Sequence, residues 1–438
     1  MSIELVSALM AGSFVGLLLI GMPLAFAAGA VGVLFALVLY GAPGLTLVVS
    51  RVFTLLGNSV LVSVPLFVFM ACLLERAGIA DDIFRVVAAW ASRVPGGLAV
   101  AVILTSTLMA AMVGVLGAEI VTIGIVALPA MLSRGYSKDL ALGSICAGGG
   151  LATLIPPSVV FIMYGLTAGV SIGQLYMAGI VPGLMLASMY IAYIMVRATL
   201  NPALAPRALT EEATWPLSRK LGLARHLVLP GLVVLMVLGS LYFGWATPTE
   251  AGGVGVFGAA LSMIAKGRMS WDNVRRAVEE TTKTTAMLYW LFFGSSALIG
   301  VYTLAGGTQM VQSMLTAFPL GPVGLLIVVQ LVWIVLGCFI DWIGILLLTA
   351  PIFVPVMVKM GFDPVWLGVL FCMNMQISYI SPPFGPAAFY LKGVAPPDIT
   401  IGDIFRSIWP YLGLQVVALG IVMAFPQIAL WLPQTMSR

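Results

Sequence analysis

The sequence predicts an all-α polytopic membrane protein with an internal repeat, in which each repeat has a re-entrant helical hairpin and a broken helix. Apolar residues make up 61% of the chain and charged residues only 8%, against roughly a quarter charged in soluble proteins. Two proline pairs, Pro156-Pro157 and Pro382-Pro383, interrupt apolar segments, and proline breaks a helix because it lacks a backbone N–H. The same offset of 226 residues separates these pairs and separates Pro129 from Pro355.

The N-terminal region is expected to cross the membrane three times. The apolar run Leu5–Tyr40 is nearly two crossings long at about 20 residues each, with a break at Pro23. Leu45–Leu56 has apolar residues at helical spacing, which predicts a helix lying at the membrane interface. Val60–Leu74 is the third crossing, and Asp81–Trp90 is a second short amphipathic helix. Since Glu4 stands where a signal peptide needs basic residues, we expect no cleaved signal.

The first hairpin is predicted over Leu98–Leu132, about a bilayer and a half in length. Its centre, Val113–Glu119, is too rich in glycine for a helix interior, which predicts a hairpin tip inside the membrane. A single kinked span is the alternative. The first broken helix follows over Lys138–Thr167, and Ser171–Gln174 forms a capping-box sequence before the next span.

The middle of the chain is expected to hold a cytoplasmic linker and two further crossings. Residues 197–225 form the longest polar segment, with three prolines and several basic residues. Val228–Trp245 and Ala251–Ile264 are predicted crossings, and a second basic cluster runs from Lys266 to Lys283. Two crossings return the chain to the same side, which the positive-inside rule makes cytoplasmic.

The second half repeats this order. Trp290–Leu304 is predicted to be a span, Gly321–Met360 a hairpin with Asp341 at its apex, and Asp363–Gly393 the second broken helix. Thr400–Asp403 repeats the cap, and Trp409–Leu432 is the last span. If the halves have opposite orientations, these are the two inverted repeats found in secondary transporters.

Two carboxylates, Asp341 and Glu119, lie near the middle of long apolar segments, each at a predicted hairpin apex. An acid at the bilayer centre costs about 2.5–3.5 kcal/mol on insertion scales, so a partner is expected. Each carboxylate is predicted either to coordinate a cation or to cap free backbone N–H groups at its turn.

The two breaks present complementary backbone groups. A half-helix beginning at Pro157 or Pro383 offers N–H groups and a partial positive charge to an anion. A half-helix ending near Gly148 or Ser378 offers carbonyl oxygens to Na⁺. Hydroxyl ligands are available there on Ser158, Ser378 and Ser381. The amides of Asn374 and Gln376 have two open interpretations, ligand binding and helix-to-helix hydrogen bonding.

Other chemistry is poorly supported by the sequence. His226 is the only histidine, the four cysteines lie singly in apolar runs, and no P-loop motif is present. Proteolysis by paired aspartates needs a second membrane Asp, and a net charge of +4 is too small to indicate nucleic-acid binding. We therefore expect no cofactor and no nucleic-acid partner, and transport driven by an ion gradient remains.

Several segments, in order along nearly the whole chain, resemble the large membrane subunit (the M or DctM-like subunit) of TRAP transporters, the tripartite ATP-independent periplasmic transporters. They include Leu128 to Tyr136, Ala147 to Ser158 with Tyr164-Gly165, Ala246-Thr247-Pro248-Thr249-Glu250-Ala251, Asp341, Ala350 to Pro355, and Asn374 to Gly385.

This resemblance implies sodium-coupled uptake of a small organic anion, chiefly a carboxylate, by an elevator mechanism in a bacterial inner membrane. It also implies two partners besides membrane lipid: a small four-helix membrane subunit and a periplasmic substrate-binding protein. The scaffold would comprise residues 1–95, 171–320 and 396–438. The transport domain would comprise 96–170 and 321–395.

By the same resemblance, the first sodium site would involve Gly114, Gly117, Gly148 and Ser158, and the second Gly337, Asp341, Ser378 and Ser381. The substrate would meet Asn374, Pro156, Pro157, Pro382, Pro383 and Gly385. The chain departs from the family at the first tip, where Glu119 follows Gly117-Ala118 in place of a hydroxyl-rich run, and at Gln376, where many relatives carry an acid. Alternative functions are a stand-alone ion-coupled anion carrier and, more distantly, a membrane-embedded enzyme.

Overall fold

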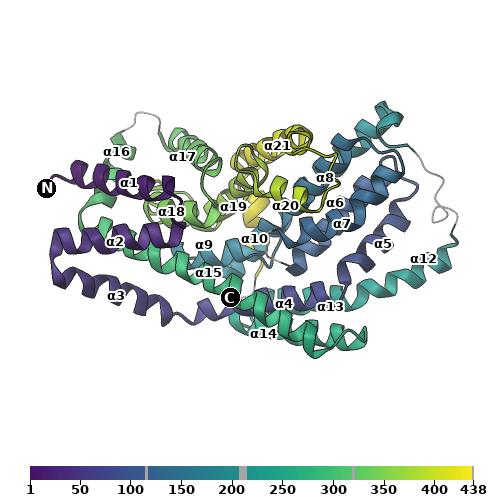
Figure 1. The fold of residues 1–438 in the computed structure, drawn as a ribbon, viewed down its shortest axis with the longest axis horizontal. Helices are drawn as coiled ribbons and strands as arrows, with labels where there is room; N and C mark the ends of the chain where they lie inside the picture. The colour runs from purple at the N-terminus through teal and green to yellow at the C-terminus, as the bar shows by residue number, and fades with distance from the viewer. Residues whose placement is uncertain (114–116, 207–214, 318–320, 437–438) are drawn as a thin grey trace.

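The computed structural model describes residues 1–113, 117–206, 215–317 and 321–436, and in these ranges all regular structure is helical (Figure 1). Five of the described helices are long and apolar enough to cross a membrane, and several shorter apolar helices accompany them. The all-helical, multi-pass membrane prediction is therefore confirmed.

The N-terminal helices match the predicted segments closely. The run of apolar residues divides between Leu19 and Leu24, at the predicted break. The helices are α1 (Ile3–Leu19), α2 (Leu24–Tyr40), α3 (Ala42–Leu56), the 3-10 turn η1 (Ser59–Val62), α4 (Ser63–Arg76) and α5 (Ile79–Ala91). Helix α3 leaves Val49 and Phe53 exposed, as expected for a helix at an apolar interface.

The first repeat forms the predicted hairpin and broken helix. The hairpin consists of α6 (Gly97–Val113) and α7 (Ala118–Ser133). The broken helix consists of α8 (Lys138–Gly150), the 3-10 turn η2 (Leu151–Thr153) and α9 (Val159–Ala168). The second half-helix begins at Val159 and not at Pro157, because the residues from Leu154 to Ser158 form an irregular turn.

The middle region differs from the prediction at α15. The helices are α10 (Ile172–Leu200), η3 (Pro202–Leu204), α12 (Leu217–Ala224), η4 (Arg225–Leu227), α13 (Val228–Tyr242), α14 (Pro248–Ala265), α15 (Trp271–Leu304) and α16 (Gly307–Ala317). The predicted span from Trp290 is only the second part of α15. Its polar first part is helical because Ser270 caps it by accepting the Asn273 N–H at 3.2 Å, so Lys283 lies on a helix.

The second repeat follows the order of the first. Its helices are α17 (Gly321–Gly337), α18 (Trp342–Lys359), α19 (Pro364–Ile380), α20 (Pro386–Val394), α21 (Ile401–Ala424) and α22 (Gln427–Gln434). Helix α20 begins at Pro386, three residues after Pro383, because the Gly385 N–H donates to the Ser381 carbonyl at 2.8 Å and closes a turn. The last span begins at Ile401, before Trp409, where Thr400 and Asp403 form a reciprocal capping box.

Equivalent helices of the two repeats make equivalent contacts. The first hairpin helix packs on the first half-helix of its own repeat, in the pairs α6–α8 and α17–α19. The second hairpin helix packs on the second half-helix of the other repeat, in the pairs α7–α20 and α18–α9. The long helix that follows each broken helix also packs on the first half-helix of the other repeat, because α10 contacts α19 and α21 contacts α8. The two repeats therefore interlock.

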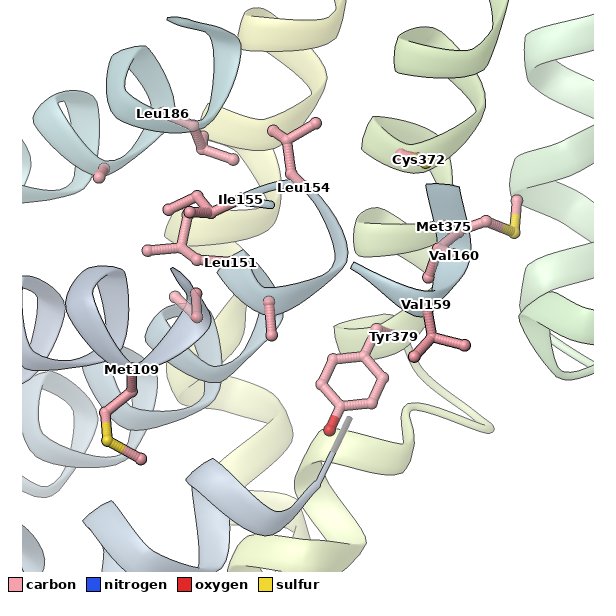
Figure 2. Packing of buried hydrophobic residues seen from close by; sticks show 14 of the residues in the cluster. Met109, Leu151, Leu154, Ile155, Val159, Val160, Leu186, Cys372, Met375 and Tyr379 are labelled. Atoms are coloured by element: carbon pink, nitrogen blue, oxygen red, sulfur yellow. The ribbon is translucent and has the colours of Figure 1, made fainter. Parts of the chain in front are cut away.

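The first break is packed deep in the apolar core. Figure 2 shows Leu151, Leu154 and Ile155 of the break between Leu186 of α10 and Met109 of α6. The Leu154 and Ile155 N–H groups both donate to the Leu151 carbonyl, at 3.0 and 2.9 Å. Irregular backbone is thus buried in protein and not exposed to lipid.

An ion pair of 2.9 Å between Lys138 and Asp398 also joins the two repeats. The hydrogen bond from Lys138 lowers the pKa of Asp398.

Candidate functional site

A large open cleft brings both breaks and one hairpin tip together. Its cavity volume is about 520 Å³. One wall comes from α2 and α15, and the other from the start of α9, the tip between α17 and α18, the end of α19 and the start of α20. The lining residues are Pro23, Leu24, Ala25, Phe26, Val159, Val160, Thr284, Met287, Leu288, Trp290, Leu291, Asp341, Trp342, Ile343, Tyr379, Phe384, Pro386 and Tyr390.

The cleft carries one acidic side chain and no basic one among these lining residues. Asp341 is the N-cap of α18, and its carboxylate accepts the Ile343 N–H at 3.4 Å. This distance exceeds the usual 2.7–3.2 Å, so the cap is a weak one. The structure therefore places Asp341 where the capping interpretation requires it, while its charge still faces the cleft.

The structure brings the residues of the predicted second sodium site together. Gly337, Asp341 and Ser378 line one small cavity that joins the cleft. The Ser378 hydroxyl donates to the Asn374 carbonyl at 3.2 Å, and the Ser381 hydroxyl donates to the Ser378 carbonyl at 3.4 Å. Because both hydrogens are used on carbonyl groups, both hydroxyl oxygens keep lone pairs for a cation.

Gly337 is where the second tip comes closest to the broken helix. A Cβ built at this position would overlap the Ser378 side chain. If the predicted second sodium site forms here, Gly337→Ala should push the tip away from Ser378 and raise the Na⁺ concentration needed for half-maximal uptake by at least about threefold, since small displacements of ligands weaken a site strongly. The measurement is uptake against Na⁺ concentration in proteoliposomes containing the complete transport system.

Gly420→Ala is the matched control, because a Cβ at Gly420 in α21 would meet no atom within 4 Å. The control should leave the curve unchanged. An alanine at position 337 that also leaves it unchanged would show that close approach of the tip to Ser378 does not matter for sodium.

The residues of the predicted first sodium site have separate neighbours. Gly114 lies outside the described residues. Gly117 adopts a φ of 102°, and a Cβ there would lie 2.8 Å from the Tyr390 ring. Gly148 packs against Ser106 of α6, and the Ser158 hydroxyl donates to the Thr153 carbonyl at 2.8 Å. The described residues thus assemble no first site comparable to the second.

Glu119 is a buried carboxylate without a partner. Its side chain is 0% exposed, and both oxygens lack hydrogen bonds among the described residues. Gly117 is the N-cap of α7, with no side-chain cap, so the described structure gives no support to a capping role for Glu119. The hydroxyls of Thr105 and Ser106 on α6 are also buried and have no hydrogen-bond partner in the described part of the chain. Sequence analysis missed these two, although the run Thr105-Ser106-Thr107 in an apolar helix was a usable signal.

The predicted substrate residues lie beside the cleft and do not line it. Pro156 and Pro157 are buried, Pro382, Pro383 and Gly385 form the turn before α20, and both Pro-Pro bonds are cis. Their neighbours Val159, Phe384 and Pro386 line the cleft instead.

The side-chain amides of Asn374 and Gln376 do not line the cleft either. The side-chain nitrogen of Asn374 donates to the carbonyl and to the side-chain oxygen of Gln330, at 2.9 and 3.0 Å. This contact holds α19 against α17, as the helix-to-helix interpretation expects. Gln376 is fully buried against Gly150, and its amide has no hydrogen-bond partner among the described residues.

Tyr379 is a functional candidate that sequence analysis did not identify. Its side chain is 4% exposed and its hydroxyl has no hydrogen-bond partner among the described residues, yet it lines both cavities. Figure 2 shows the ring next to Val159, with the hydroxyl directed away from the apolar cluster. A buried polar atom without a partner needs a ligand or water.

The chain is similar to known proteins of one family. Residues 11–428 match the family described as the tripartite ATP-independent periplasmic transporter, DctM component. The chain is 30% identical, over 96% of its length and 95% of the other protein, to the C4-dicarboxylate TRAP transporter large permease protein DctM of Vibrio cholerae. It is 28% identical, over 97% and 98%, to the ectoine TRAP transporter large permease protein TeaC of Halomonas elongata.

Among solved structures, the YdaH transporter of Alcanivorax borkumensis has a similar fold, with a TM-score of 0.61 at 16% identity over 89% of this chain and 91% of that one. The matching relatives are named as transporter permeases and not as enzymes. The chain therefore belongs to the DctM family, the large membrane permeases of tripartite ATP-independent periplasmic transporters.

Proposed function

We propose that this permease takes up a small organic anion, with a carboxylate group, by symport with Na⁺ across a bacterial inner membrane. The observation that carries the proposal is the cleft, which is lined by residues next to both breaks and by Asp341 at the second tip. Broken helices beside a single cavity are typical of secondary transporters, where half-helix ends bind the substrate and the coupling ion.

Na⁺ binding at the second tip would make anion binding dependent on sodium. The charge of Asp341 repels an anion in the cleft, and no lining residue is basic. A Na⁺ held by Asp341, with the hydroxyl oxygens of Ser378 and Ser381 and carbonyl oxygens near Gly337, cancels this repulsion. Hard cations prefer such oxygen ligands. Coupling then follows from electrostatics, because an anion is bound only beside a bound cation.

The carboxylate would be received by the two half-helix starts that reach the cleft. Val159 and Val160 open α9, and Pro386 opens α20. Free N–H groups and the partial positive charge at a helix N-terminus stabilise an anion. Tyr379 also lines the cleft, and its hydroxyl, which has no hydrogen-bond partner among the described residues, offers a further donor.

At the first tip we propose Glu119 as the charged ligand of a first sodium site. Its buried carboxylate, which has no hydrogen-bond partner among the described residues, needs a cation or a proton. Gly117, Gly148 and Ser158, with Gly114, would complete that site only in a state where the tip sits closer to the first break.

Movement is proposed to be of the elevator type. The interlocked elements of residues 96–170 and 321–395 would form the transport domain and slide against a scaffold of residues 1–95, 171–320 and 396–438. The contacts α7–α20 and α18–α9 between the repeats support their moving as one body, and the contacts of α8 with α21 and of α19 with α10 would then belong to the surface that slides. The cleft between them and α2 and α15 supports the position of the sliding surface.

The proposal also includes two protein partners, a small four-helix membrane subunit and a periplasmic substrate-binding protein. We expect this chain to co-purify with the small subunit when the two are co-expressed. In proteoliposomes, Na⁺-driven uptake should require both partners and should fall to background when either is omitted. The measurement is uptake of radiolabelled substrate with an inward Na⁺ gradient, compared with choline in its place.

The omission series also separates the proposal from the alternative, a stand-alone carrier. Full uptake by the large permease alone would contradict the need for partners and would favour that alternative. Partner-dependent uptake that is equal in Na⁺ and choline would contradict sodium coupling while leaving the assembly intact.

A further inference from the structure

The cleft has two aromatic walls. Phe26 and Trp290 form a ring pair on the side of α2 and α15, with centroids 5.7 Å apart. Trp342, Phe384, Tyr390 and Tyr379 form the second aromatic wall, from the second tip, the end of α19 and α20. Phe26 and Trp290 are 53% and 56% exposed, so their rings present open surface to the cleft. Large rings that remain exposed beside a cavity supply apolar contact area for a ligand.

The charged residues that line the cleft restrict the number of carboxylate groups that a ligand can carry. The lining contains one carboxylate, Asp341, and neither lysine nor arginine. Recognition of two carboxylates depends strongly on arginine or lysine, because paired charge-assisted hydrogen bonds offset the loss of hydration. Here the positive groups are the partial charges at the starts of α9 and α20 and a Na⁺ at Asp341. These groups suit one carboxylate and leave a second one buried without a partner.

The polar end of the cleft is defined by more than helix starts. The hydroxyl of Tyr379 is buried and lacks a partner among the described residues, and Tyr379 lines the cleft together with Val159 of α9 and Pro386 of α20. A ligand oxygen at this point would satisfy it. We infer that the substrate is a monocarboxylate with an uncharged apolar body, its carboxylate near Tyr379 and its body between the aromatic walls. This inference rests on the proposed function and specifies its substrate class.

Four acids test the inference against its alternatives. Hexanoate and adipate have the same number of carbons and differ in the second carboxylate. Phenylacetate adds a ring. Glycine betaine carries a quaternary ammonium group, which aromatic rings and the Asp341 charge would attract if no Na⁺ were bound there. The permease, purified with its small subunit in lipid nanodiscs, is titrated with each by calorimetry in NaCl and in choline chloride.

Hexanoate and phenylacetate should bind in Na⁺ at least about tenfold more tightly than adipate and betaine, which corresponds to about 1.4 kcal/mol. If adipate or betaine binds more tightly than hexanoate and phenylacetate, and binds only in Na⁺, the inferred substrate class is wrong and sodium coupling is retained. Equal binding of hexanoate in Na⁺ and choline would instead contradict the coupling and uphold the class. No binding of any acid would overturn both.

Two variants locate the binding. Trp290→Leu removes one of the two rings of the first aromatic wall and should weaken the binding of phenylacetate at least about fivefold, because ring-to-ring contact is lost in addition to apolar area. Its matched control is Trp271→Leu, on the same helix but 81% exposed and outside the cleft. Met287→Arg adds the missing cation at a lining position and should raise adipate affinity about tenfold. If Trp290→Leu and Trp271→Leu behave alike, or if Met287→Arg leaves adipate unchanged, the cleft is not the binding site for the acid.

Discussion

Uptake should be abolished when Pro382 and Pro383 are both replaced by alanine. Alanine restores the two missing N–H donors and favours helix, so α19 would continue through the turn between Ser381 and Gly385. The N-terminus of α20 would then no longer open at Pro386, beside Phe384 in the cleft. We expect the protein to insert and purify normally while Na⁺-driven uptake falls at least about a hundredfold, because the helix start proposed to receive the substrate is lost.

The matched control also replaces two prolines, Pro182 and Pro410. These lie inside the continuous helices α10 and α21, where no break would be removed. Transport by Pro182→Ala/Pro410→Ala should stay within about twofold of the unmodified protein, because alanine is well tolerated in a helix. Normal uptake by the Pro382→Ala/Pro383→Ala variant would mean that this break has only a structural role and does not bind the substrate.

The order of the helices was largely predictable from the sequence. Pro23, Pro156 and Pro382 stand close to helix ends, because proline lacks a backbone donor and its ring clashes with the preceding turn. Single prolines such as Pro182 and Pro410 nevertheless lie inside continuous helices. The sequence prediction placed the start of α15 at Trp290 instead of Trp271, because only the hydropathy of the segment was considered. Ser270 was the available signal, since a serine before a helical pattern is a typical N-cap.

The site was only partly predictable, for a physical reason. Local chemistry identified Asp341, a charge in an apolar run, and the serines next to a break. Contacts between distant segments left no local pattern: Gly117 packs on Tyr390, and Phe26 faces the cleft together with Trp290. Glycines at the first tip have no side chain whose chemistry could indicate a partner. The cleft therefore became apparent only from the interlocked packing of the two repeats.

Replacing Asp341 with asparagine should separate the two roles of this residue. Asparagine and aspartate are nearly equivalent as N-caps, so α18 should keep its start and the protein its thermal stability. A neutral amide binds Na⁺ far more weakly than a carboxylate in a site of low dielectric. We therefore expect the Na⁺ concentration for half-maximal uptake to rise at least about tenfold, equivalent to about 1.4 kcal/mol.

The matched control for this prediction is Asp363→Asn. Asp363 is the N-cap of α19, accepts the Val365 and Trp366 N–H groups at 2.8 and 3.1 Å, and does not line the cleft. It is therefore a capping aspartate, and its variant should retain the original Na⁺ curve. The measurement is initial uptake rate against Na⁺ concentration for the unmodified protein and both variants, each reconstituted with the small subunit and the binding protein. If the curve of Asp341→Asn coincides with that of Asp363→Asn, Asp341 is a cap as well, and sodium would have to bind through carbonyl groups and the hydroxyls of Ser378 and Ser381.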